Sequence, residues 1–231
     1  MIIYFILAII IGYFIGAIPF GLIYVKIFTG KDIREVGSGR MGGTNSLRAG
    51  GWGVGFATAL SDVFKGAMSV LITTWVLQNT VPAETLPWIQ IFAGISAVFG
   101  HNWSVFYGFR GGAGTGPNVG WASAIWFPMF PLAFALMFSG IFFLGIASVA
   151  SMLMGLVIPI GFGILYYTGL DSTYGLAHTP AYMIGGIVTA CVVAFALRGN
   201  FQRLMRGEER VVGLRARRMK KREQKKEQET A

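Results

Sequence analysis

Long apolar runs alternate with short polar stretches along this chain. Hydrophobic residues dominate segments at roughly 2–25, 52–77, 87–107 and 181–197, each of about the length that crosses a bilayer as a helix. A further stretch, 119–168, is nearly uncharged. Pro128 and Pro131 bracket one break within it, and Gly145 to Ser148 offers a second, so that it divides into three short helices. The pattern therefore predicts an all-α protein with about seven transmembrane helices.

Composition places the chain among integral membrane proteins. It is 54% hydrophobic and 13% charged, and a soluble domain of this length carries about twice that charge. The single cysteine, Cys191, lies in an apolar segment, so a disulfide framework is not expected. The first apolar segment lacks a basic n-region and a small-residue cleavage site, and we interpret it as a retained helix.

The basic residues predict the orientation in the membrane. Lysine and arginine cluster after the first segment, at Lys65, at Arg110 and after residue 197, whereas the connections 78–87 and 169–180 contain none. The positive-inside rule then puts the N-terminus outside and the C-terminus in the cytoplasm. We expect a membrane domain over 1–205 and a basic cytoplasmic tail over 206–231, which lies against anionic lipids. The net charge of +9 also suits nucleic-acid binding, but such tails are routine beside a last helix, and no nucleic-acid partner is expected.

A polar, glycine-rich stretch lies between the first two apolar segments, at 37–48. Its four glycines allow close approach of the backbone to a ligand, and Ser38, Thr44 and Asn45 add neutral donors. Arg48 adds a fork-shaped cation, which completes a set suited to a phosphate at the membrane surface. The alternative is an ordinary basic loop that obeys the positive-inside rule, although that rule does not require the glycines.

Two more polar stretches, 100–118 and 197–209, fall on the same side in the predicted topology. Together the three resemble, in order, the signature motifs of the acyl-phosphate:glycerol-3-phosphate acyltransferases, the PlsY family. Those motifs read approximately GSGNxGATNxxR, GHxxPVFxxFKGGKG and HRxNIxRLxxGxE, against 37–48, 100–114 and 197–209. The first segment, with its Gly16 to Gly21 stretch, and the pair Asp62 and Lys65 are also similar to that family. The resemblance extends from about residue 4 to 213.

The resemblance implies a reaction at the cytoplasmic face of a bacterial plasma membrane, in a multi-pass enzyme of phospholipid synthesis. Such enzymes transfer a fatty acyl group from acyl phosphate to the 1-hydroxyl of sn-glycerol 3-phosphate, giving 1-acyl-glycerol 3-phosphate and phosphate. No cofactor is expected. The sequence shows neither a metal-ligand cluster nor an arrangement for an acyl-enzyme, which favours direct attack by the glycerol hydroxyl.

The resemblance also assigns roles to individual residues. Catalysis is assigned to Ser38, Arg48 and Asn200. Substrate binding is assigned to Thr44, Asn45, His101, Arg110, Gly111, Gly112, Gly114, Arg198 and Arg203. Structural support is assigned to Asp62 and Lys65, as a buried ion pair, and to Glu209, which braces the arginines. Structural alternatives stay open: a cap for Ser38, shaping of the loop for Thr44 and Asn45, tight turns and helix packing for the glycines, and capping or loop anchoring for His101. For Asp62 and Lys65 a direct ligand contact is the second reading.

The chain departs from the family pattern at several positions. Ala113 and Leu197 stand where the family has a lysine and a histidine, Arg40 stands where asparagine is usual, and Val211 lies at about the place of a further lysine. Arg40 or Arg110 could replace a lost cation. An alternative function is therefore a divergent member with weak or lost catalysis that binds phosphate-bearing lipids or metabolites. A small anion transporter is a third reading, which the lack of charge in the late helices disfavours.

Overall fold

The computed structural model describes residues 1–212, and over that range the regular elements are helices. The predicted all-α class is therefore confirmed for the described residues. The basic run at 220–226, assigned above to a cytoplasmic tail, lies outside them. The elements are α1 (Ile2–Ala17), α2 (Phe20–Thr29), η1 (Ile33–Glu35), α3 (Gly43–Leu77), α4 (Leu86–Asn102), η2 (Val105–Tyr107), α5 (Thr115–Ile125), α6 (Met129–Ser139), the π-helical turn η3 (Gly140–Leu144), α7 (Ala147–Thr168), α8 (Leu170–Thr173), α9 (Ala181–Ala196) and α10 (Arg198–Met205).

The first apolar segment is two helices and not the single one predicted over 2–25. The helix stops at Ala17 and resumes at Phe20, because Pro19 has no N–H with which to continue the helical ladder. The break leaves carbonyls unpaired, and polar side chains of other elements satisfy them. Lys65 Nζ donates to the carbonyl of Ile18 at 2.8 Å, and Ser104 Oγ donates to that of Ala17 at 2.5 Å.

The second helix begins earlier than its apolar segment predicts, at Gly43 instead of residue 52. A kink at Gly51 (φ 80°, ψ −174°) divides it into a short polar part and a long apolar part. The two parts pack closely: a Cβ on Gly55 would lie 2.6 Å from Cβ of Leu47. The second half of the polar stretch 37–48, which hydropathy put outside the helices, is therefore helical over residues 43–48.

The uncharged block divides where the sequence predicted. α5 ends at Ile125, and α6 starts directly after Pro128 with Pro131 in its first turn, where a missing N–H has no consequence. The second break falls at Gly145, whose φ of 66° ends η3 before α7 begins. Three helical stretches therefore occupy the block, as expected.

Close helix–helix contact is built on small residues. α1 packs along α4, and a Cβ on Gly12 or Gly16 would collide with the backbone of Ala93 or Ala97. Such stripes of small residues are typical of helices that associate in lipid. Large apolar side chains, among them Phe64, cover much of the outer surface, as a bilayer requires.

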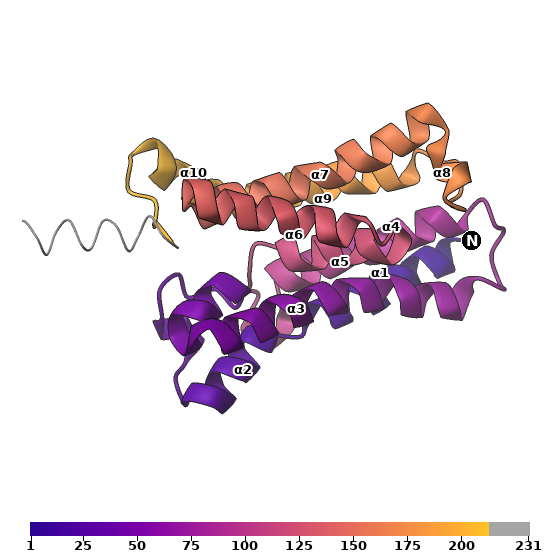
Figure 1. The fold of residues 1–231 in the computed structure, drawn as a ribbon. Helices are drawn as coiled ribbons and strands as arrows, with labels where there is room; N and C mark the ends of the chain where they lie inside the picture. The colour runs from indigo at the N-terminus through magenta and orange to yellow at the C-terminus, as the bar shows by residue number, and fades with distance from the viewer. Residues whose placement is uncertain (213–231) are drawn as a thin grey trace, which may run out of the picture.

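The connecting segments and the N-terminus lie at the two ends of the bundle (Figure 1). The loop before α3 and helix α10 lie at one end, and the N-terminus and α8 lie at the opposite end. By length and apolarity three stretches of the described chain can span a bilayer, Ile2–Thr29, Gly43–Leu77 and Ala147–Thr168, and the bent pair α9 and α10 would make a fourth. The count of seven crossings and the orientation of the termini stay predictions.

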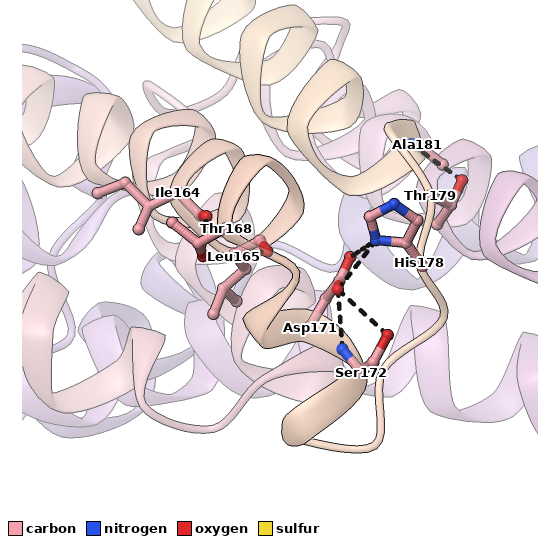
Figure 2. A network of polar contacts seen from close by, with 8 residues as sticks. All are labelled: Ile164, Leu165, Thr168, Asp171, Ser172, His178, Thr179 and Ala181. Atoms are coloured by element: carbon pink, nitrogen blue, oxygen red, sulfur yellow. Dashed lines mark hydrogen bonds and ion pairs between the residues drawn. The ribbon is translucent and has the colours of Figure 1, made fainter.

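At the far end, the connection between α7 and α9 is fixed by one buried carboxylate (Figure 2). Asp171 accepts a hydrogen bond from the backbone N–H of Ser172 at 2.8 Å and lies 2.8 Å from Nδ1 of His178. The ring of His178 stacks on Tyr166. This network closes the α7–α9 turn and takes no part in the cavity described next.

Candidate active site

Asn45 shapes the first glycine-rich loop. Its side chain is buried, and Nδ2 donates to the carbonyls of Ile33, Val36 and Arg40 while Oδ1 accepts from the backbone N–H of Ser38 at 3.1 Å. Gly37 has φ +56°, and a Cβ there would lie 2.5 Å from Asn45 Oδ1. Of the two roles left open for Asn45, the contacts support shaping of the loop.

A cavity of about 170 Å³ lies where the three polar stretches meet at this end of the bundle. The 37–48 stretch contributes one side, the start of α5 a second, α6 and α7 a third, and residues of the stretch 197–210 a fourth. Its lining includes Ser38, Arg40, Gly43, Thr44, Asn45, Arg48, Asp62, His101, Gly112, Ala113, Gly114, Thr115, Phe134, Met137, Ser148, Met154, Leu197, Asn200, Glu209 and Arg210. Residues more than 150 positions apart in the chain thus share one site.

Two helix N-termini face this cavity without side-chain caps. α3 starts after Gly42, and α5 starts after Gly114, whose φ of +80° turns the chain into the helix. Uncapped N–H groups and the positive end of the helix dipole attract anions. Beside the second terminus, Thr115 Oγ1 is buried and has no hydrogen-bond partner in the described chain. Both features fit an anionic, hydrogen-bonding ligand.

Three arginines line the cavity, in two different states. Arg48 and Arg210 have neither a hydrogen bond nor an ion pair to any described residue. Arg40 is held, because Nη1 donates to Asn200 Oδ1 at 3.1 Å and Nη2 to the carbonyl of Ala196 at 2.8 Å. Burial lowers the pKa of Arg40, and the positive charge of Arg203 acts in the same direction. Arg40 therefore joins the first polar stretch to the third.

The floor of the cavity is a buried charge cluster. Lys65 Nζ lies 2.9 Å from Asp62 Oδ1, one helical turn apart on α3, so the predicted ion pair is confirmed. His101 is a third member that the sequence did not connect with them, with Nδ1 3.5 Å from Asp62 Oδ1. All three side chains are at most 4% exposed. Lys65 also reaches the broken helix at Ile18, so the cluster ties the cavity floor to α1.

The glycines of the second stretch allow close packing as well as approach of a ligand. Gly112 donates its N–H to the carbonyl of His101 at 3.1 Å, so that group is not free to cradle an anion. A Cβ on Gly112 would overlap the His101 ring, and one on Gly111 would overlap the His101 carbonyl. Gly111 and Gly112 therefore serve a tight turn against His101, whereas Gly114 forms the uncapped start of α5.

The third stretch is organised by Glu209. Its carboxylate is buried and accepts from Asn200 Nδ2 at 2.8 Å, from Arg203 Nε at 3.1 Å and from Ser148 Oγ at 3.3 Å. The predicted bracing of arginines by Glu209 is thus seen for Arg203. Both ends of the Asn200 amide are occupied, by Arg40 and Glu209, which suits a positioning residue.

Arg110 and Arg198 do not face this cavity. They line an adjacent open depression of about 520 Å³, which shares Ser38, Arg40 and Gly112 with it. Arg198 packs on the ring of Phe195 and donates to the Phe195 carbonyl at 2.9 Å. The expectation that Arg110 replaces a lost cation in the main cavity is therefore not supported by its position, and Arg40 is the substitute of the two that lies there.

Sequence reasoning missed Arg210 and Ser148. Ser148 was read only as part of a helix break, yet it anchors Glu209. Arg210 directly follows Glu209, in a stretch rich in basic residues, and its charge was assigned to the tail. The available signal was its adjacency to a residue already placed in the third polar stretch.

The chain is similar to known glycerol-3-phosphate acyltransferases. A family model described as glycerol-3-phosphate acyltransferase matches residues 6–207. The glycerol-3-phosphate acyltransferase of Chlorobium phaeobacteroides (strain BS1) is 34% identical over 223 residues, covering 86% of this chain and 92% of the relative. That of Lawsonia intracellularis (strain PHE/MN1-00) is 33% identical over 210 residues, covering 88% and 93%. A crystal structure of PlsY (YgiH), an integral membrane glycerol 3-phosphate acyltransferase in its glycerol 3-phosphate form, superposes with a TM-score of 0.74 at 27% identity, covering 90% of this chain and 96% of that one.

Proposed function

The chain belongs to the glycerol-3-phosphate acyltransferase family of phospholipid synthesis, and we propose that it transfers a fatty acyl group from acyl phosphate to the 1-hydroxyl of sn-glycerol 3-phosphate. The products are 1-acyl-glycerol 3-phosphate and inorganic phosphate. The active face is the cytoplasmic side of a bacterial plasma membrane, where the soluble substrate is available. Family membership supports the acceptor, and the donor and the acylated position are the parts that need a test.

One observation carries the proposal: two arginines, Arg48 and Arg210, that have no partner among residues 1–212 and two uncapped helix N-termini face an apolar wall across a single cavity. Phe134 and Met137 of α6 and Met154 of α7 form that wall. An acyl chain lies against it, with its phosphate head toward the arginines. The cavity thus suits an amphiphile and a small dianion together, which are the two substrates of this reaction.

In the proposed mechanism the glycerol hydroxyl attacks the acyl carbonyl directly. Its oxygen forms a bond to the carbonyl carbon, the bond from that carbon to the phosphate oxygen breaks, and the phosphate leaves with the electron pair. We do not assign Asp62 as the general base, because Lys65 holds its carboxylate in an ion pair. The hydroxyl proton is therefore assigned to the departing phosphate. Arg48 and the helix N-termini stabilise the charge that develops.

Ser38 and Asn200 serve this step in different ways. The Ser38 hydroxyl lines the cavity, accepts from the Arg40 N–H at 3.4 Å and keeps its own proton for a substrate oxygen. Asn200 holds Arg40 and Glu209 in place. Thr44, at the uncapped start of α3, offers a further hydroxyl to the phosphate.

The test uses the purified full chain with acyl phosphate and labelled glycerol 3-phosphate. Formation of 1-acyl-glycerol 3-phosphate with one phosphate released per acyl group transferred is the expected result. Transfer only from acyl thioesters would refute the donor, and a 2-acyl product would refute the position. Binding of glycerol 3-phosphate without transfer from any donor would leave a phosphate-binding membrane protein, the alternative that Ala113 and Leu197 raise.

A further inference from the structure

The residues that follow α10 cross back over the cavity. We call residues 207–212 the strap. It leaves α10 at Gly207 (φ +73°), and Glu208 N donates to the carbonyl of Arg203 at 2.8 Å. At its other end Val211 forms a β-bridge with Ile146, and Val212 N donates to the carbonyl of Gly145 at 2.8 Å. The strap therefore joins α10 to the junction of η3 and α7, at the same end of the bundle as the loop before α3 (Figure 1).

Arg210 lies between two fixed points of the strap. On one side, buried Glu209 is bonded to Asn200, Arg203 and Ser148. On the other side, Val211 is paired with Ile146. The backbone at Arg210 is therefore held by its neighbours, yet its side chain lines the cavity, is exposed and has no partner among residues 1–212.

The charges around the cavity do not balance without a ligand. Lys65 neutralises Asp62, and Arg203 neutralises Glu209. Among residues 1–212, Arg40, Arg48 and Arg210 have no acidic partner, so three positive charges face one space. Such a cluster destabilises itself by repulsion unless an anion enters, and a phosphate monoester supplies up to two negative charges.

We propose that Arg210 binds the phosphate of glycerol 3-phosphate, so that the strap forms part of the acceptor site. This inference rests on the proposed function. We assign glycerol 3-phosphate to Arg210, and not acyl phosphate, because the Arg210 side chain is exposed to water, as binding of a soluble dianion requires. The apolar wall of α6 and α7 serves the amphiphilic donor. Arg210 and Arg48 then approach the bound substrates from different segments of the chain, α10's extension and α3.

Steady-state kinetics of the full chain test this assignment. Arg210→Ala should raise KM for glycerol 3-phosphate about tenfold or more, as expected for one charge-assisted contact, with kcat and KM for acyl phosphate within about twofold of wild type. Arg210→Lys should recover part of the loss, since it restores the charge but not the fork. The matched control is Arg206→Ala. It removes an exposed arginine at the end of α10, directly before the strap, that does not line the cavity.

The outcomes separate this proposal from the proposed function. An active wild type in which Arg210→Ala leaves KM for glycerol 3-phosphate unchanged, or no different from Arg206→Ala, overturns the assignment while the function stands. A change confined to KM for acyl phosphate overturns it too, because Arg210 would then serve the donor. If the wild type transfers no acyl group, binding of glycerol 3-phosphate by wild type and Arg210→Ala decides: weaker binding by the variant supports the strap site, and equal binding overturns it.

Discussion

Replacing Arg48 by alanine should impair substrate binding and leave folding intact. In the free protein the Arg48 guanidinium has no hydrogen bond or ion pair to the described residues, so Arg48→Ala should change the free energy of unfolding by no more than about 0.5 kcal/mol. In the complex the same group can make two parallel charge-assisted hydrogen bonds to one phosphate, each worth about 1.5–3 kcal/mol. The loss of about 3–6 kcal/mol corresponds to a fall in kcat/KM of about 10²- to 10⁴-fold.

The assay is acyl transfer from acyl phosphate to glycerol 3-phosphate by the purified variants, with melting temperatures measured in the same detergent. Arg48→Lys should lie between wild type and alanine, because it keeps the charge and loses the fork. Lys31→Ala, which removes an exposed cation of the loop before α3 that does not line the cavity, serves as the control and should be as active as wild type. Arg48→Ala with more than about a tenth of wild-type kcat/KM, at an unchanged melting temperature, would refute a role in phosphate binding.

Three further results are expected. Lys65→Met should lower the stability by about 3–5 kcal/mol, because the buried Asp62 carboxylate and the Ile18 carbonyl lose their partner; an unchanged melting temperature in detergent would contradict the buried pair. Ala113→Lys should lower kcat/KM, because three arginines already face the space that residue 113 lines, whereas a gain in activity would show that the site lacks a cation. Reporter fusions at residues 82 and 174 should read as external and fusions at 115 and 215 as cytoplasmic, and a cytoplasmic reading at 174 would refute the seven-helix topology.

The helices could be predicted where local signals in the sequence, apolarity together with proline and glycine, determine them. The division of 119–168 was visible because proline and glycine act locally on the backbone, at Pro128 and Gly145. The start of α3 was not visible, because residues 43–50 are polar and rich in glycine, which argues against a helix. Packing overrides that preference: Gly43 and Gly55 allow the two parts of α3 to touch. Helix ends that depend on tertiary contacts cannot be seen in hydropathy.

The site was predictable as a set of residues and not as a set of contacts. The polar stretches could be placed on one side of the membrane, and the cavity draws on all three. Which donor meets which acceptor depends on side-chain geometry. Asn45 looked like a donor for a ligand, yet the amide is used up inside the loop. Arg40 and Arg110 were equal candidates for one role until the fold put only Arg40 in the cavity.

The departures from the family motifs make physical sense as a redistribution of charge. A phosphate responds to the positive charge around it, whichever segment of the chain supplies that charge. Ala113 and Leu197 bring none, whereas Arg40 and Arg210 bring two charges to the same cavity. Leu197 is buried next to Ala196, whose carbonyl holds the Arg40 guanidinium, and a protonated histidine at 197 would repel that cation. An arginine at 40 and a neutral residue at 197 are therefore mutually consistent. This favours a site whose cations are supplied from other positions over a site that has lost catalysis.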